Sequence, residues 1–234
     1  MRARRTAGFF AQVPGGGATE SAKSGLSKPG RVVGYIAQSI IVDHRAVTGH
    51  QGTHSMLTHR LAQMDELESL KTLMNAAISE LQKPFLNESQ IASSRLIMGL
   101  DTQLVEDGTY FVVQSGKELA GCGGWSRRAT LYGGDQTPGR SSAFLDPTKD
   151  PAKVRAMYTH PHHVRKGVGR LILSLCEEAA RAEGFTKMEL MATLAGEPLY
   201  RACGYVPLER TDDARGGDPV PLLRMVKILG GQCV

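Results

Sequence analysis

Between residues 154 and 184 the spacing of the apolar positions changes once, from the period of a strand to that of a helix. Residues 154–159 alternate in character, and Pro161 ends this run because proline cannot donate to a β-ladder. From Val168 apolar residues recur at helical spacing as far as Gly184, a typical helix stop. The strand is expected to present Val154, Ala156 and Tyr158 on one face and Arg155, Met157 and Thr159 on the other. The helix is expected to bury Val168, Leu171, Ile172, Leu175, Ala179 and Ala182 and to expose Arg170, Ser174, Glu177, Glu178 and Arg181.

Strands and helices are also predicted on both sides of this unit. Before it come an edge strand at 55–62, a helix opened by the capping box Asp65-x-x-Glu68, a second helix from Asn87-x-x-Gln90 to about Leu100, and a hairpin of strands at 109–114 and 118–125. After it come a strand at 186–192, a short helix at 196–203, and strands at 205–208 and 219–228. This order predicts an α/β fold, with a mixed, mostly antiparallel sheet and helices on both faces.

Glycine marks two further places. Gly121, Gly123 and Gly124 thin the second strand of the hairpin and predict a bulge or the close approach of another backbone. Residues 132–151 are rich in Gly, Pro and Ser and predict a long loop. We expect this loop to border a binding pocket; a mobile insertion is the alternative.

The turn between the central strand and helix carries the chemistry. Gly167 and Gly169 lack Cβ atoms, so an anion can approach main-chain N–H groups that have no partner at a helix N-terminus. Arg165, Lys166 and Arg170 add positive charge around the same point. A strand, a glycine turn and a helix start together predict a pyrophosphate site. Close packing of helix on strand is the alternative use of the glycines.

Two motifs carry a resemblance to a known family. The segment VRKGVGRLIL resembles motif A of the GCN5-related N-acetyltransferases (GNAT), and EPLYRACGYVPLE resembles the next motif of that family. The resemblance extends over residues 56–229. Val164 stands where the family usually has Gln or Arg; because the contact there comes largely from backbone N–H groups, binding is expected to tolerate the change.

The resemblance implies direct transfer of an acetyl group from acetyl-CoA to a primary amine of a small molecule or protein, in a ternary complex. It implies that the main chain of the central strand pairs with the pantetheine arm and that Tyr200 protonates the leaving thiolate as general acid. A role as a core aromatic is the alternative for Tyr200. The implied cofactor-binding residues are Met157, Tyr158, Thr159, Val164, Arg165, Lys166, Gly167, Val168, Gly169 and Arg170.

The general base is left open. Many members of the family place a Glu on the central strand, and residues 154–159 contain none. Glu189 on the next strand is one candidate. His160, His162 and His163 at the end of the central strand have a suitable pKa, but because they flank a surface turn their side chains are expected to be solvated. Deprotonation through water is the remaining possibility.

The acceptor site is also left open. The family builds it from the loop between the first two helices, here Leu81–Phe85, and from the last hairpin, here Glu209–Asp218. The acidic residues of that hairpin are expected to form a solvated turn; a rim that attracts a cationic amine is the alternative.

Composition limits the other functions. The 234-residue chain is 41% hydrophobic with a formal net charge of +5, which suits an anionic cofactor. No Lys/Arg tract with interleaved aromatics indicates nucleic acid, and no apolar run approaches membrane-spanning length. Cys122, Cys176, Cys203 and Cys233 lack the spacing of a metal site or disulfide framework. The sequence thus predicts a cytoplasmic protein without a metal site, with a homodimer left open.

Residues 1–55 are expected to form a basic, largely disordered extension preceding an acetyltransferase domain at 56–230. Residues 1–60 hold eight Lys/Arg and two Asp/Glu, a balance of +6, and an organelle transit peptide is the alternative. Asp43-His44-Arg45 resembles the DHRxxDG signature of dihydrolipoamide acyltransferases, with Thr48 in place of its Asp. Because that catalytic domain needs far more chain, His44 is expected to be inert. Two alternative functions remain: a non-catalytic acyl-CoA-binding module, and protein interaction through residues 1–55.

Overall fold

The computed structural model describes residues 56–230, and the expectations for residues 1–55 and for Cys233 lie outside this range. The core is a seven-stranded sheet with the order β1-β2-β3-β4-β5-β7-β6. All neighbours are antiparallel except β4 and β5, which run parallel. The strands are β1 (Leu57–Leu61), β2 (Tyr110–Ser115), β3 (Glu118–Ser126), β4 (Ala152–Thr159), β5 (Lys187–Thr193), β6 (Val206–Asp213) and β7 (Val220–Ile228). The predicted mixed, mostly antiparallel sheet is confirmed.

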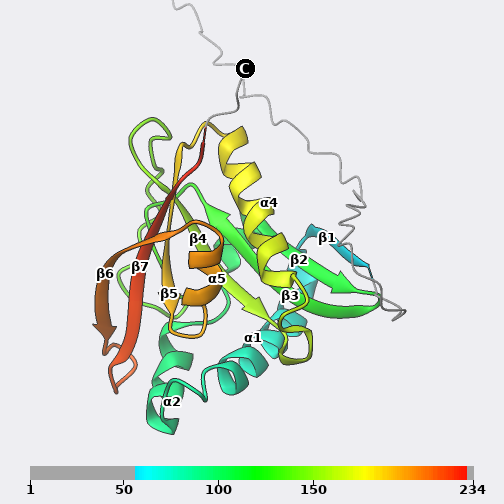
Figure 1. Cartoon of the computed structure of the whole chain (residues 1–234), viewed down its shortest axis with the longest axis vertical. Helices are drawn as coiled ribbons and strands as arrows, with labels where there is room; N and C mark the ends of the chain where they lie inside the picture. Colours follow the sequence, from blue (N-terminus) through cyan, green and yellow to red (C-terminus); the bar gives the residue numbers. More distant parts are fainter. Residues whose placement is uncertain (1–55, 231–234) are drawn as a thin grey trace, which may run out of the picture. The chain divides into compact units, whose positions relative to one another are not determined.

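Helices cover both faces of this sheet (Figure 1). One face packs under α4 and α5 in a core that includes Trp125, Ile172 and Met225. The opposite face packs against α1 and α3, with Tyr110 and Val112 at its centre. The helices are α1 (Leu67–Leu81), α2 (Glu88–Ile97), α3 (Thr102–Glu106), α4 (Val168–Ala182) and α5 (Glu197–Ala202), with 3-10 turns η1 (Met64–Glu66) and η2 (Pro161–His163). None of these helices has the length and apolar character needed to cross a membrane.

The start of α1 differs from the prediction. The capping interaction joins Gln63 to Glu66, whose carboxylate accepts the main-chain N–H of Gln63 at 2.9 Å, whereas Asp65 and Glu68 are exposed. Arg60 also binds Glu66, so the chain turns two residues earlier than the box Asp65-x-x-Glu68 implied. The predicted box was therefore wrong in register.

The end of α2 also differs. Gly99 has φ +143°, a conformation that helices cannot continue through, so α2 ends at Ile97 rather than near Leu100. The five-residue α3 follows and was not predicted, because one short turn carries no periodic pattern. The box Asn87-x-x-Gln90 is confirmed, with the N–H of Gln90 donating to Asn87 Oδ1 at 2.8 Å.

The orientation of α4 was partly wrong. Glu177, expected on the exposed face, is 5% exposed and accepts two hydrogen bonds from Lys227 Nζ at 2.7 and 2.8 Å. The buried stripe runs through Val168, Ile172, Leu173, Cys176 and Ala180. Because apolar residues occupy more than half of the helix circumference, the pattern did not fix the rotation, and the ion pair with β7 compensates the buried charge. Gly184 has φ +88° and follows α4, as predicted.

The alternation predicted for the central strand breaks at a bulge. Ala156 has φ +48°, and the pairing of β4 with β3 shifts register between Cys122 and Gly124. Val154 and Met157 therefore share the α4 face, while Ala156 and Tyr158 lie on the α1 face. The predicted bulge near Gly121–Gly124 is confirmed, and a Cβ on Gly121 would lie 2.4 Å from Val168 Cγ1.

Candidate active site

The central strands part in the middle of the sheet. The parallel pairing of β4 with β5 covers only Ala152–Val154 against Met188–Leu190, and the bulge at Arg155 and Ala156 then turns β4 away. Beyond it, Tyr158 and Thr159 pair with β3 on one edge, and no described strand pairs with the other edge. The main chain of Met157–Thr159 is thus open to an extended ligand.

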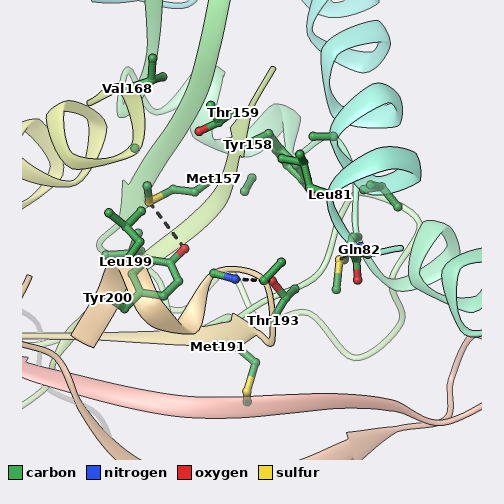
Figure 2. A pocket seen from close by; sticks show the side chains of 18 of the residues that line it. Leu81, Gln82, Met157, Tyr158, Thr159, Val168, Met191, Thr193, Leu199 and Tyr200 are labelled. Carbon is green, nitrogen blue, oxygen red and sulfur yellow. Dashed lines mark hydrogen bonds between the residues drawn. The ribbon is translucent and has the colours of Figure 1, made fainter. Parts of the chain in front are cut away.

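A cavity of about 660 Å³ lies between the separated strands. Figure 2 shows Tyr200 and Leu199 of α5 facing Met157 of β4, with Leu81 and Gln82 at the α1 side and Met191 and Thr193 of β5 below. The cavity reaches from the N-terminus of α4 to the ends of α1 and α2. The same cavity is thus lined by residues from both sides of the sheet, α4 and α5 on one and α1 on the other.

The glycine turn closes one end of the cavity. Arg165 and Gly167 adopt left-handed conformations, with φ +63° and +87°, and Gly167 is the N-cap of α4. Within residues 56–230, the N–H groups of 167–170 have no hydrogen-bond acceptor. A Cβ on Gly169 would lie 2.7 Å from Leu199 Cδ2 and 3.7 Å from Thr159 Oγ1, so a side chain there would narrow the space. Successive free N–H groups at a helix start form an anion site.

Nine of the ten predicted cofactor-binding residues line the cavity, together with the predicted acid Tyr200. Lys166 is the exception: its side chain is exposed outside the lining. Arg165 and Arg170 do line it, and neither forms an ion pair with the described residues. Their charges are therefore available to a bound anion. The roles of these residues stay predictions.

Tyr200 is held in place by packing rather than by polar contacts. It is 8% exposed on α5, and its hydroxyl lies 3.8 Å from Met157 Sδ. The turn before α5 is fixed by Thr193, whose Oγ1 accepts the N–H of Gly196 at 3.1 Å. Burial raises the pKa of Tyr200, so the hydroxyl keeps its proton at neutral pH.

Tyr158 has a side-chain role that the sequence did not indicate. Its hydroxyl accepts the N–H of Gly99 at 2.9 Å and so ties β4 to the segment that follows α2. Burial raises the pKa of this tyrosine too. Both tyrosines line the cavity but belong to different cores: Tyr200 packs in the core that includes α4, and Tyr158 packs against the core that includes α1.

The candidate bases are placed differently from one another. Glu189 is 2% exposed, binds Lys153 and Arg224, and does not line the cavity. His160 and His162 also lie outside the lining.

His163, expected to be solvated, is instead 5% exposed and does line the cavity. Its Nε2 lies 2.9 Å from Glu118 Oε2. The 3-10 turn after Pro161 buries the ring against the start of β3, which the sequence pattern could not show.

The acceptor end uses other segments than those predicted. Leu81 and Gln82 line the cavity as expected, but no residue of Glu209–Asp218 does. The solvated turn is the interpretation that the structure bears out, since Glu209, Asp212 and Asp218 are exposed away from the cavity. Asp213 is instead buried and bound to Arg215 at the end of β6. The 132–151 loop borders the cavity through Tyr132 and Gly133, as predicted. No cluster of His, Cys, Asp or Glu suited to a metal occurs in the part of the chain that the structure describes.

Comparison with known proteins identifies a family. Residues 71–205 match the model of the acetyltransferase (GNAT) family. A search of curated proteins gave no match.

Three similar solved structures show the fold. A GCN5-related N-acetyltransferase from Rhodopseudomonas palustris is 17% identical with a TM-score of 0.57, covering 77% of this chain and 100% of its own. YncA of Salmonella typhimurium, solved with acetyl-CoA, is 17% identical with a TM-score of 0.50 over 76% and 96% of the two chains. The PaiA N-acetyltransferase of Thermoplasma acidophilum, solved with coenzyme A, is 14% identical with a TM-score of 0.51 over 74% and 98%.

Proposed function

The chain belongs to the acetyltransferase (GNAT) family, and from this we propose that it transfers an acetyl group from acetyl-CoA to a primary amine of a small molecule or protein. One observation carries the proposal. β4 and β5 separate after Val154, and the cavity between them reaches the N–H groups of Gly167–Arg170, which have no acceptor among the described residues. Two proteins of similar fold were solved with acetyl-CoA or coenzyme A, which supports the same ligand here.

The residues of the cavity fit the parts of acetyl-CoA. The N–H groups of Gly167–Arg170 suit the diphosphate, since they have no acceptor among the described residues and lie at the positive end of the α4 dipole. Arg165 and Arg170 add charge without a competing carboxylate among the described residues. The open edge of Met157–Thr159 suits the amides of the pantetheine arm, which add to β4 as a further strand. When bound, acetyl-CoA supplies the thioester whose C–S bond breaks.

Tyr200 serves the leaving group in this proposal. The amine nitrogen attacks the thioester carbonyl, the C–N bond forms, the C–S bond breaks, and the Tyr200 hydroxyl donates its proton toward the thiolate sulfur. Burial raises the pKa of Tyr200, which keeps the hydroxyl protonated, and the same dry surroundings raise the pKa of the thiolate that receives the proton. The only described contact of the hydroxyl is Met157 Sδ, so the donor is free to turn to the ligand.

The proton of the amine leaves by another route. No Asp or Glu of the described residues lines the cavity. His163 does line it, but its Nε2 is engaged by Glu118 Oε2 at 2.9 Å. The attacking amine is therefore proposed to arrive neutral or to lose its proton to water, and the enzyme contributes chiefly by holding the two reactants together.

Two measurements test the proposal. Calorimetry should detect coenzyme A binding to the intact chain, and the affinity should be about 1,000-fold lower in Gly169→Val. A screen of an amine library with acetyl-CoA, following free thiol release, should find turnover. Binding without turnover of any amine would favour a non-catalytic acyl-CoA-binding module, and the absence of binding would refute both.

A further inference from the structure

The acceptor end of the cavity has an apolar wall of its own. A hydrophobic cluster separate from the two main cores packs between α2, β5 and β7. Five of its members also line the cavity; we call them the apolar wall, and they are Ile97, Met98, Tyr132, Met191 and Leu222. Leu81 and Ile78 of α1 face the cavity from the other side. A ligand group that reaches this end meets methyl, thioether and aromatic surface.

The charged groups on the cavity lining have one sign. Within the described part of the chain, its ionisable side chains are Arg155, Arg165, Arg170, His163 and the tyrosines, with no carboxylate. Arg165 and Arg170 lie in the glycine turn, at the diphosphate end. Only Arg155 belongs to the middle of β4, where its guanidinium donates to Gly133 O at 3.0 Å.

Three buried carboxylates lie near the cavity but outside its lining, and each forms an ion pair with a lysine or arginine side chain. Glu189 binds Lys153 and Arg224; Asp213 binds Arg215; Asp101 binds Arg140 and Arg155. All three carboxylate side chains are at most 2% exposed. They neutralise the protein's own cations and are not free to receive an ammonium group from a ligand.

We propose that the acceptor is a small primary amine carried on an uncharged apolar body, and that di- and polyamines are excluded; this rests on the proposed function. A second ammonium group would lose its water against the apolar wall without a counter-ion, which is strongly unfavourable. The same surroundings favour the neutral form of the attacking amine, the form that the reaction needs.

Hexylamine and 1,6-diaminohexane test the inference because they have the same six-carbon chain and differ by one terminal amino group. With acetyl-CoA, kcat/KM for hexylamine should exceed that for the diamine on the order of 100-fold, the penalty expected for an unpaired buried charge. Equal or better use of the diamine overturns the inference while leaving acetyl transfer standing.

A charge placed in the pocket should reverse the preference. Leu81 is half-buried at the end of α1, on the α1 side of the cavity (Figure 2). Leu81→Glu should lower the rate with hexylamine and raise that with 1,6-diaminohexane, so that the ratio of the two falls at least about tenfold. Leu81→Gln, with the same shape and no charge, should lower both rates and leave the ratio near the wild-type value.

The failure of the inference and that of the proposed function have different signatures. Thermal unfolding and coenzyme A calorimetry of both variants show whether they fold and keep the diphosphate site. If the wild-type chain binds coenzyme A but acetylates neither amine of the pair, the acceptor class is wrong. If it does not bind coenzyme A, the proposed function is wrong and the acceptor class falls with it.

Discussion

The two ends of the cavity are built in different ways. At the diphosphate end, the turn Val164–Gly169 and the start of α4 offer main-chain N–H groups, so the site lies within one short segment. At the acceptor end, the apolar wall is assembled from α2, the 132–151 loop, β5 and β7, which are far apart in the chain. The first end is made of backbone and the second of side chains.

This difference indicates which end of the cavity many sequences could form and which end is specific to this chain. A backbone site needs only glycines at positions where a Cβ would intrude or where φ is positive, so many sequences can form it. A side-chain site changes with every substitution in its wall. We therefore expect variants at the glycine turn to affect every acceptor equally, and variants at the wall to change the choice of acceptor.

The largest expected effect is on coenzyme A affinity in Gly169→Val. The Cβ atom of the new side chain would lie 2.7 Å from Leu199 Cδ2 and would displace either α5 or the bound diphosphate. Loss of about two charge-assisted hydrogen bonds lowers affinity by about 1,000-fold. Calorimetry measures this, and Gly169→Ala should give a smaller loss. Unchanged affinity in the valine variant would place the diphosphate elsewhere.

Tyr200→Phe should act on turnover and not on binding. We expect kcat to fall about 100-fold, the ordinary contribution of a positioned acid, with the KM for acetyl-CoA unchanged. Tyr205→Phe is a matched control because Tyr205 is also buried and its hydroxyl also lies 3.8 Å from a methionine sulfur, that of Met188, outside the cavity. Equal kcat values for the two variants would show that Tyr200 only fills space.

The same division, between features built by one short segment and features assembled from distant segments, decides which parts of the fold the sequence predicted. The order of the strands and of the helices other than α3, the hairpin and the glycine turn were predicted because each depends on local periodicity or on one or two special residues. The bulge at Ala156 was missed in the strand pattern, although the glycines opposite it in β3 signalled a bulge. The rotation of α4 was missed because Lys227, which binds Glu177, is fifty residues away in sequence.

The acceptor end could not be predicted in the same way. The acidic residues of Glu209–Asp218 left open a rim for a cationic amine, yet Asp213 forms an ion pair with Arg215, two residues later in the sequence. Sequence shows which residues carry charge, but not which charges neutralise each other. The apolar wall draws on residues 97, 132, 191 and 222, and no periodicity links positions so far apart.

Glu189→Gln tests whether a carboxylate behind the wall has a structural role. Burial opposes ionisation of Glu189, but its hydrogen bonds to Lys153 and Arg224 outweigh burial and lower its pKa below the ordinary 4.5. A lowered pKa means that the folded state binds the proton less tightly than the unfolded state does. The stabilisation is therefore complete above about pH 4.5 and is lost as the pH falls through the lower, folded-state value.

The expected loss of stability in Glu189→Gln is about 2 kcal/mol at pH 7, less than for a fully buried pair because Arg224 is 41% exposed. Urea unfolding from pH 7 to pH 3 should show the difference from wild type shrinking toward the acid end. The folded variant should keep its kcat. A kcat reduced 100-fold with normal coenzyme A binding would instead identify Glu189 as the missing base.

The smallest expected effect separates backbone strain from ligand contact at the glycine turn. Gly167 has φ +87° and Gly139 has φ +77°, and a Cβ on either would meet no atom within 4 Å. Alanine at each position should therefore cost a similar amount of stability, about 1 kcal/mol, through strain alone. Only Gly167 lies beside the proposed diphosphate, so only Gly167→Ala should also lower coenzyme A affinity, by about tenfold. Parallel losses of stability with equal affinities would show that a Cβ at residue 167 does not touch the bound diphosphate, against the proposed placement beside this residue.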